Sequence, residues 1–347
     1  MTVDKIYCMS SWLMHRNIID KNKQFADNII PQFTKRKIDG VPINNSHELG
    51  LCLEKQVETA CRYGKAVLAL SGGIDSAVLA KYMPAGSSAY TFKCVVPNKQ
   101  VVDETIQAAK YASECGLNHK IVNVSWEDMI KYAPILMKRK GMPIHSIEVQ
   151  IYKAALKAKE EGFSKMIFGE TADIHYGGLD KLLSRNWTYD EYLKRFSYLL
   201  PSKVLKEYVL EELPYKDSLM TNGLIDVHKH LLKWDILESI ASYENACELA
   251  GIEFVAPYSN TYLNKPLDYE RIKKGDSKYF VRELFSNLYR GWDIPNKIPM
   301  PRPMDEWLKG WKGPVRKEFL PNCVSSLKPD EKWLVYALEM FLNMIER

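Results

Sequence analysis

Short apolar runs alternate with helix-like stripes through the first half of the chain. Residues 66–70 (Ala-Val-Leu-Ala-Leu) form a continuous apolar run that is too short for a helix and is bounded by glycine and serine. Such a run is typical of a parallel strand buried on both faces. By the same criteria, further strands are predicted at 88–96, 119–124 and 166–168, and helices at 47–62, 76–82, 103–115 and 146–161.

This alternation predicts the fold class. It favours an α/β fold with a doubly wound, mostly parallel sheet, because helices are the usual connections between parallel strands. Ligands of such sheets bind at the carboxyl ends of the strands. We therefore expect functional residues in the turns after Leu70, Phe92 and Phe168.

The second half of the chain has a different pattern. After about residue 180 strand candidates disappear, and helical stretches rich in leucine and aromatic residues are predicted at 188–213, 224–250, 267–289 and 329–346. The apolar stripe of the last helix is interpreted first as core packing and second as a homodimer contact. We expect three regions: a leader or small subdomain at 1–45, an α/β core at 46–180 and a mainly helical portion at 181–347.

Composition and charge narrow the function classes. The 347 residues are 46% hydrophobic and 26% charged, as in an ordinary globular chain of about two domains. A net charge of +5 permits an anionic ligand but lacks the clustered excess of nucleic-acid-binding proteins, so no such partner is expected. Seven cysteines without C-x-x-C spacing, no signal-peptide pattern and no membrane-length apolar run predict a cytoplasmic protein.

The turn after Leu70 carries the strongest chemical signal. It reads Ser71-Gly72-Gly73-Ile74-Asp75-Ser76, in which the glycines allow close approach and positive φ, and the serines add hydroxyl donors. Free N–H groups at the start of the following helix attract anions. Asp75 would repel a bare phosphate, which suggests a divalent cation between the two. A plain glycine turn into a helix is the other interpretation.

Two blocks resemble a known family. Ser-Gly-Gly-x-Asp-Ser is the signature loop of the ATP pyrophosphatases, which cleave ATP between its α and β phosphates. Residues 168–178 (Phe-Gly-Glu-Thr-Ala-Asp-Ile-His-Tyr-Gly-Gly) are similar to the Ser-Gly-Glu-Gly-Ala-Asp-Glu-Ile-Phe-Gly-Gly stretch of asparagine synthetase-type enzymes. Weaker matches follow at Glu253, Pro257, Lys278 and Arg282, and the resemblance covers about residues 50–315.

The resemblance implies a reaction and its ligands. A carboxylate would be activated by ATP as an acyl-adenylate, pyrophosphate would leave, and ammonia or an amine would attack to give an amide. ATP and Mg²⁺ are the implied cofactors, with Mg²⁺ on Asp75 and Asp173. The implied nucleotide-binding residues are Leu70, Ser71, Gly72, Gly73, Asp75, Ser76, Phe92 and Gly169.

Three catalytic residues are implied in the same way. Glu170 would lie near the reacting carbonyl, as a general base or as an anchor for ammonium; a helix-start carboxylate that only caps the helix is the alternative. Lys278 corresponds to the lysine of the family's lysine–arginine helix. The lysine that the family places in the next loop is not evident, and Arg302 is the nearest cation, with Lys297 and Lys309 as rivals.

Departures from the family pattern narrow the reaction. The family's N-terminal glutaminase domain has no counterpart before Ser71. The nitrogen is therefore expected as free ammonia, as an amine, or from a separate ammonia-supplying or carrier protein. Ile174, Val255 and Asn260 replace charged family residues on the acceptor side. We expect the acceptor to be a small-molecule carboxylate other than aspartate.

Two other functions share the loop. RNA-modifying enzymes of the thiolase or lysidine type use it, although the paired cysteines or basic region that such enzymes often show are not evident. A non-catalytic ATP-binding scaffold is the third interpretation, and the changes at Ile174 and Val255 favour it.

Overall fold

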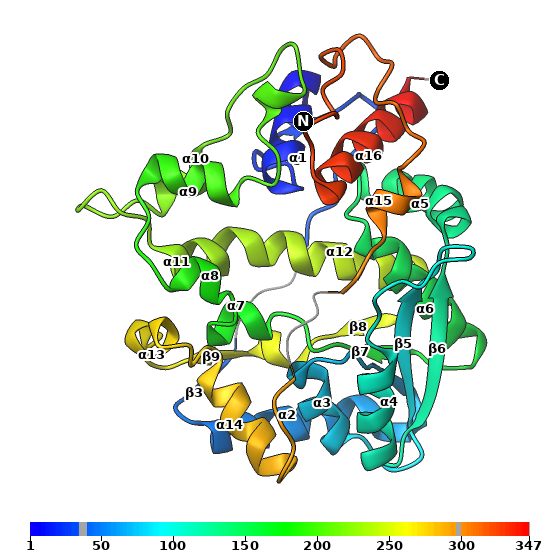
Figure 1. Cartoon of the computed structure of the whole chain (residues 1–347), viewed down its shortest axis with the longest axis vertical. Coiled ribbons are helices and arrows are strands. Elements are labelled where there is room, and N and C mark those ends of the chain that lie inside the picture. Colours follow the sequence, from blue (N-terminus) through cyan, green and yellow to red (C-terminus); the bar gives the residue numbers. More distant parts are fainter. Residues whose placement is uncertain (35–39, 296–299, 347) are drawn as a thin grey trace.

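The computed structural model describes residues 1–34, 40–295 and 300–346. Its main sheet has five parallel strands in the order β6-β5-β4-β7-β8 (Figure 1). This arrangement confirms the predicted α/β fold with a doubly wound, parallel sheet. The strands span Ala66–Ala69 (β4), Ser88–Cys94 (β5), Asn118–Val124 (β6), Lys165–Ile167 (β7) and Glu253–Val255 (β8).

The strand order brings two distant loops together. Strand β4 lies between β5 and β7, with Leu68 in register with Ala89 on one side and Ile167 on the other. The chain first builds outward from β4 to β5 and β6, and then returns to place β7 on the opposite side. Ligands bind in the crevice that such a reversal opens at the carboxyl ends of the strands. The segments after β4 and β7 face this crevice.

Helices cover both faces of the sheet, and each face has its own hydrophobic core (Figure 1). One core includes Leu53, Val78 and Phe285, and the other includes Met137, Ile151 and Ile240. The helices of the first face are α2 (Ser46–Cys61), α3 (Ile74–Tyr82), α4 (Thr105–Glu114) and α14 (Tyr279–Leu288). Those of the second are α5 (Trp126–Lys140), α6 (Ile147–Glu160) and α12 (Ile236–Leu249).

The remaining elements are shorter or lie beyond α12. The helices are α7 (Ala172–Tyr176), α8 (Asp180–Leu183), α9 (Tyr189–Phe196), α10 (Leu213–Asp217), α11 (Val227–His230), α13 (Tyr269–Lys273), α15 (Met304–Trp307) and α16 (Pro329–Ile345). Single turns lie at Arg62–Gly64, Pro201–Lys203, Leu231–Asp235 and Pro257–Asn260. Two small parallel sheets pair β1 (Thr2–Val3) with β2 (Lys23–Gln24), and β3 (Val41–Ile43) with β9 (Thr261–Leu263).

The prediction that strands end near residue 180 is wrong. Strand β8 completes the main sheet beside β7, and β9 lies further along the same half. Each has only three residues, too few for an alternating pattern to emerge from the sequence. The predicted helix at 188–213 is also too long, because α9 ends at Phe196.

The N-terminal residues, expected to form a leader or a small subdomain, contain a buried helix. Helix α1 (Lys5–His15) packs against α16, and Arg16, which ends it in the left-handed conformation, forms an ion pair of 2.9 Å with Glu238 on α12. Lys5 forms a second ion pair, of 2.6 Å, with Glu346 near the other end of the chain. The first residues therefore pack on the helical half, while the three-region division stays a prediction.

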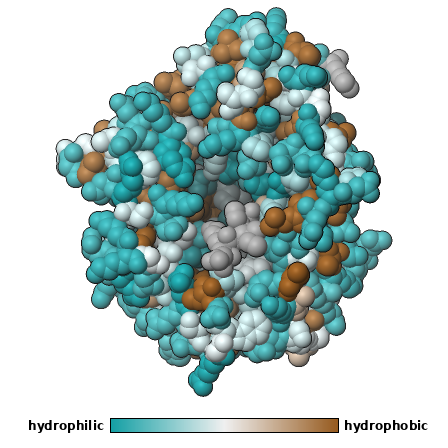
Figure 2. Space-filling model, viewed as in Figure 1, coloured by the Kyte–Doolittle hydropathy of each residue, from teal (hydrophilic) through white to brown (hydrophobic). Residues whose placement is uncertain are grey.

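Three further observations concern the surface, the helices and the cysteines. Figure 2 shows a largely hydrophilic face with a hollow near its middle. In the described part of the chain no helix has both the length and the apolar character that crossing a bilayer requires. All seven cysteines are free thiols.

Candidate active site

One cavity of about 580 Å³ opens at the carboxyl ends of β4, β5 and β7. It contains every residue to which the sequence analysis gave a nucleotide-binding, metal-binding or first-choice catalytic role except Gly72, which packs against Glu104. The nominated residues that line it are Leu70, Ser71, Gly73, Asp75, Ser76, Phe92, Gly169, Glu170, Asp173, Lys278 and Arg302. The structure thus brings five distant segments to one place, and the role of each residue stays a prediction.

The loop after β4 is held by its own serines. The Ser71 N–H donates to the Ser76 hydroxyl at 3.0 Å, and the Ser71 and Ser76 hydroxyls lie 2.9 Å apart. The Gly73 N–H donates to the Ser71 hydroxyl at 3.2 Å. No side chain caps the start of α3, so its first N–H groups remain available to an anion.

The loop glycines provide space rather than positive φ. Gly73 has φ −88°, and Gly72 is not among the left-handed glycines. A Cβ at Gly72 would lie 3.2 Å from Glu104 Cβ, which is tighter than ordinary packing. The expectation of positive φ is therefore wrong, and the close approach of this backbone to a ligand stays a prediction.

A third glycine lets the two motifs touch. A Cβ at Gly169 would lie 3.0 Å from both Asp75 Cβ and the Ser76 nitrogen. Backbone atoms cannot yield to such a contact without moving the loop. Only glycine at 169 allows the turn after β7 to lie against the start of α3.

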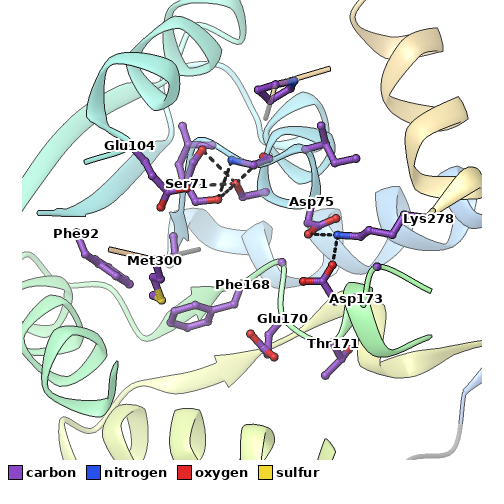
Figure 3. Close-up of a pocket in the computed structure, with 18 of the residues that line it drawn as sticks. Ser71, Asp75, Phe92, Glu104, Phe168, Glu170, Thr171, Asp173, Lys278 and Met300 are labelled. Carbon is purple, nitrogen blue, oxygen red and sulfur yellow. Dashed lines mark hydrogen bonds and ion pairs between the residues drawn. The ribbon is translucent and has the colours of Figure 1, made fainter. Parts of the chain in front are cut away.

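Asp75, Asp173 and Lys278, here called the Lys278 triad, point toward one another (Figure 3). Lys278 Nζ lies 2.5 Å from Asp75 Oδ2 and 2.7 Å from Asp173 Oδ1. Burial by itself would lower the pKa of the ammonium, but the two carboxylates outweigh burial and raise that pKa. The lysine is therefore charged throughout the physiological pH range.

The two carboxylates of the triad suit Mg²⁺. Both are hard oxygen donors that converge on one point, and Mg²⁺ commonly takes one or two protein carboxylates together with substrate phosphates. Within residues 1–34, 40–295 and 300–346, no group of three or more histidine, cysteine, aspartate or glutamate side chains is placed to hold a metal. The donor set fits a metal that brings further oxygen ligands with it.

Glu170 belongs to the opposite side of the cavity. It points away from the Lys278 triad (Figure 3), and its Oε1 accepts a hydrogen bond of 2.6 Å from the Ser239 hydroxyl on α12. Burial, followed by the charge of Glu170, raises the pKa of the neighbouring Tyr243 hydroxyl well above its usual value. Glu170 is thus oriented by α12 and does not merely cap α7.

Sequence analysis missed Ser239 and Tyr243. They stand four residues apart on α12 and so share one helical face. Tyr243 also packs edge-to-face on Phe168, with ring centroids 5.0 Å apart. The only signal available was this polar spacing within a predicted helix, and nothing in it pointed to Glu170.

Arg302 is a described cation that lines the same cavity. Its NH1 group donates to the Met300 carbonyl at 3.1 Å, and its NH2 group lies 3.5 Å from the exposed Asp330 carboxylate. Lys309 is exposed and does not line the cavity. The other rival, Lys297, lies outside the described residues.

Glu104 is a carboxylate that sequence analysis did not assign to the site. It lines the cavity beside the loop, and burial, followed by the charge of Asp103, raises its pKa to about 7, while the Gly72 N–H lowers it in part. A carboxylate next to an anion site is repulsive when ionised. Ionisation of Glu104 would therefore add a negative charge beside the loop.

Comparison with known proteins decides the family. The family model described as asparagine synthase matches residues 49–254, more than half of the chain. The chain belongs to the asparagine synthase family. That match includes the loop after β4 and the block after β7, and it ends at β8. No curated protein matches the chain.

Solved structures with similarity to this family member include three synthetases or modifying enzymes. An NH3-dependent NAD synthetase from Campylobacter jejuni is 15% identical over 38% of this chain and 60% of its own, with a TM-score of 0.26. An NMN synthetase from Francisella tularensis is 12% identical over 74% of this chain and 100% of its own, with a TM-score of 0.27.

The third structure is a U34-tRNA thiolase from Methanococcus maripaludis, which is 14% identical over 73% of this chain and 84% of its own, with a TM-score of 0.24. The chain thus spans less than two thirds of the length of the Campylobacter jejuni enzyme.

Proposed function

We propose that this member of the asparagine synthase family is an ATP-dependent ligase that forms an amide. It would adenylate a small-molecule carboxylate, release pyrophosphate, and transfer ammonia or an amine to the activated carbonyl. The observation that carries the proposal is the convergence of Asp75 and Asp173, from the helices that follow the adjacent strands β4 and β7, beside the start of α3.

The loop after β4, together with Mg²⁺ on Asp75 and Asp173, would bind the nucleotide. N–H groups at the start of α3 and the hydroxyls of Ser71 and Ser76 can donate to phosphate oxygens. Leu70 and Phe92 provide apolar surface for the adenosine. Asp75 and Asp173 would hold Mg²⁺, which when bound neutralises phosphate charge and orients the leaving pyrophosphate.

The acceptor side would carry out amide formation. An oxygen of the acceptor carboxylate attacks the α-phosphorus, the bond to pyrophosphate breaks, and the amine nitrogen then attacks the carbonyl carbon and displaces AMP. Glu170, which accepts a hydrogen bond from Ser239, would take the proton that the nitrogen loses. Arg302 would stabilise the negative charge that develops on oxygen.

The walls of the acceptor side favour an acceptor other than aspartate. Ile174, which replaces a family acid, is buried and lines the cavity. The other two changed positions lie elsewhere: Val255 ends β8, and the Asn260 amide donates to Gln56 at 2.7 Å. Apolar side chains dominate this side, at Ile147, Phe168, Ile174, Tyr243 and Met300.

The test is product analysis over a panel of carboxylic acids. The protein is incubated with ATP, Mg²⁺, each acid and either ammonia or hydroxylamine, which traps an activated carbonyl as a hydroxamate. We expect AMP, pyrophosphate and hydroxamate with at least one acid. Release of ADP and phosphate, or ATP turnover that no acid of the panel changes, would reject the proposal.

A matched pair of variants guards against contaminating enzymes. Asp75→Asn should abolish pyrophosphate release, whereas Asp190→Asn removes an exposed carboxylate outside the cavity and should leave it unchanged. Equal turnover by both variants would favour a non-catalytic scaffold. The cytoplasmic location, the nitrogen source and a carrier or ammonia-supplying partner remain parts of the proposal for cell extracts to test.

A further inference from the structure

Lys278 occupies the point on which the two metal-binding candidates converge. Its ammonium lies 2.5 Å from one Asp75 oxygen and 2.7 Å from one Asp173 oxygen, and its side chain is only 9% exposed. Asp75 lies at the start of α3, Asp173 lies on α7, and Lys278 directly precedes α14. Figure 3 shows the ammonium between the two carboxylates.

The surrounding backbone is shaped around this contact. A Cβ at Gly178 would lie 2.0 Å from Asp173 Oδ1 and 2.5 Å from Lys278 Cδ, so only glycine leaves room for the pair. Lys278 itself has φ 53°, a left-handed conformation that non-glycine residues adopt at a cost. The position of Lys278 is therefore determined by packing as well as by its attraction to the nearby carboxylates.

A divalent cation and this ammonium cannot share the point. Two cations a few ångströms apart in a partly buried site repel strongly, and both would bind the same two carboxylates. The two carboxylates also leave most of the six oxygen ligands of Mg²⁺ unsupplied. A bare metal ion would have to expel Lys278 and would gain few ligands in return.

A bound nucleotide would change both the number of ligands available to the metal and the partners available to Lys278. Phosphate oxygens add ligands for the metal and also offer the displaced ammonium a new partner within the reach of its flexible stem. Arg282, one turn further along α14, lines the same cavity, and no ion pair to a carboxylate is seen for it among the described residues. It supplies the second positive charge that draws a polyphosphate to this side.

We propose that Lys278 is a resident counter-ion that excludes free divalent cations from the Asp75–Asp173 pair and yields only to a metal delivered together with nucleotide. This inference rests on the proposed use of the cavity for ATP. It assigns an order to ligand binding: the metal enters with the triphosphate and never ahead of it. It also gives Lys278 two partners in turn, the carboxylates before binding and phosphate oxygens afterwards.

The test measures metal binding without turnover, with Mn²⁺ as the probe and its paramagnetic resonance signal as the readout. Wild-type protein should bind Mn²⁺ weakly alone and much more tightly with α,β-methylene-ATP, which cannot be cleaved between its α and β phosphates. Lys278→Met should bind Mn²⁺ without nucleotide about tenfold more tightly than wild type, or better, because the repelling charge is gone.

Two control variants separate this effect from a general change in charge. Arg282→Met removes a cation from the same cavity but not from between the carboxylates, so its nucleotide-free Mn²⁺ affinity should stay near that of wild type. Asp173→Asn combined with Lys278→Met should lose the gained affinity. Lys278→Gln replaces Lys278→Met if the latter fails to fold, as judged by thermal melting.

The outcomes separate the inference from the proposed function. Equal Mn²⁺ affinity of wild type with and without the analogue, or no gain in either Lys278 variant, overturns the counter-ion role. A gain that survives Asp173→Asn places the metal elsewhere and overturns it as well. Failure of wild type to bind the analogue at all instead removes the nucleotide site on which the proposed function depends.

Discussion

The two sides of the cavity are built on different principles. On the phosphate side, charges from three segments touch: Lys278 lies 2.5 and 2.7 Å from its two aspartates. On the acceptor side, apolar and aromatic walls surround one hydrogen-bonded carboxylate, Glu170, and one loosely paired guanidinium, Arg302. Both sides start from the same strand end, because Gly169 and Glu170 are adjacent.

This difference indicates where specificity resides. Charges held in contact suit a ligand part that never changes, such as a triphosphate, because each displaced pair must be replaced by an equivalent one. Apolar walls discriminate by shape and tolerate change, as the replacement at Ile174 illustrates. Variants on the phosphate side should therefore affect all acceptors alike, whereas variants on the acceptor side should affect individual steps or substrates.

The largest effect is expected on the phosphate side. Asp173→Asn removes one of the two carboxylates that would hold Mg²⁺ and leaves Lys278 with a single partner. Pyrophosphate release should fall roughly a thousandfold, with the same factor for every acid that the wild type accepts. Measuring this factor over several acids is the check, and a factor that varies strongly between acids would contradict the division into two sides.

Glu170→Gln probes the acceptor side and should separate two nucleophiles. Ammonia is mostly protonated near neutral pH and must lose a proton, whereas hydroxylamine is largely neutral. Amide formation with ammonia should fall about a hundredfold, while hydroxamate formation should fall far less. Ser239→Ala, which removes only the hydrogen bond to Glu170, should lie between wild type and Glu170→Gln. Equal losses with both nucleophiles would argue against Glu170 as the group that deprotonates ammonium.

Gly178→Ala should break the packing that holds the Lys278 triad. The added Cβ would meet Asp173 Oδ1 at 2.0 Å, so the triad must move. We expect the free energy of unfolding to fall by about 2 kcal/mol in urea titrations. Gly310→Ala is the control, because a Cβ there meets nothing within 4 Å, and its stability should match that of wild type. Equal stability of both variants would show that the triad is not tightly packed.

The smallest effect is a pH dependence at Glu104. Burial raises the pKa of this acid to about 7 in the folded protein, above its ordinary value, so the folded state holds the proton more tightly than the unfolded chain. The free energy of unfolding of the wild type therefore falls as pH rises from the ordinary pKa of a glutamate side chain through about 7. The Glu104→Gln variant has no ionisable group at this position. As pH rises from mildly acidic to mildly basic, its free energy of unfolding should therefore increase by about 1 kcal/mol relative to that of wild type. Thermal melts across that range, if parallel for both proteins, would contradict this.

Local signals in the sequence predicted much of the fold. The apolar run at 66–70, the glycine–serine loop and the helix at 76–82 form one continuous unit, as their order predicted, and a ligand site after β4 stays a prediction. The block at 168–178 predicted a second segment at the same sheet edge, which the pairing of β4 with β7 confirms. These inferences hold because strand, turn and helix start are all determined within a few residues.

Long-range packing accounts for what the sequence did not reveal. Strand β8 is too short to recognise alone and forms because β7 offers it an edge. The hydrogen bond from Ser239 to Glu170 joins residues that are 69 positions apart, and Arg16 reaches Glu238 across 222 positions. The position of Lys278 between Asp75 and Asp173 depends on the space at Gly178, a glycine of the matched block at 168–178 whose contact with the lysine the sequence did not reveal. Such contacts depend on the finished tertiary structure.

The separation of 203 positions between Asp75 and Lys278 has a consequence for biosynthesis. While the ribosome is still producing the last quarter of the polypeptide, the emerged portion already contains both aspartates but not their balancing lysine. Folding during translation proceeds from the N-terminal end, so the nascent sheet edge stays electrostatically incomplete until α14 has left the exit tunnel. Ribosome-stalled chains cut before residue 278 should therefore not yet form this charge-balanced pocket.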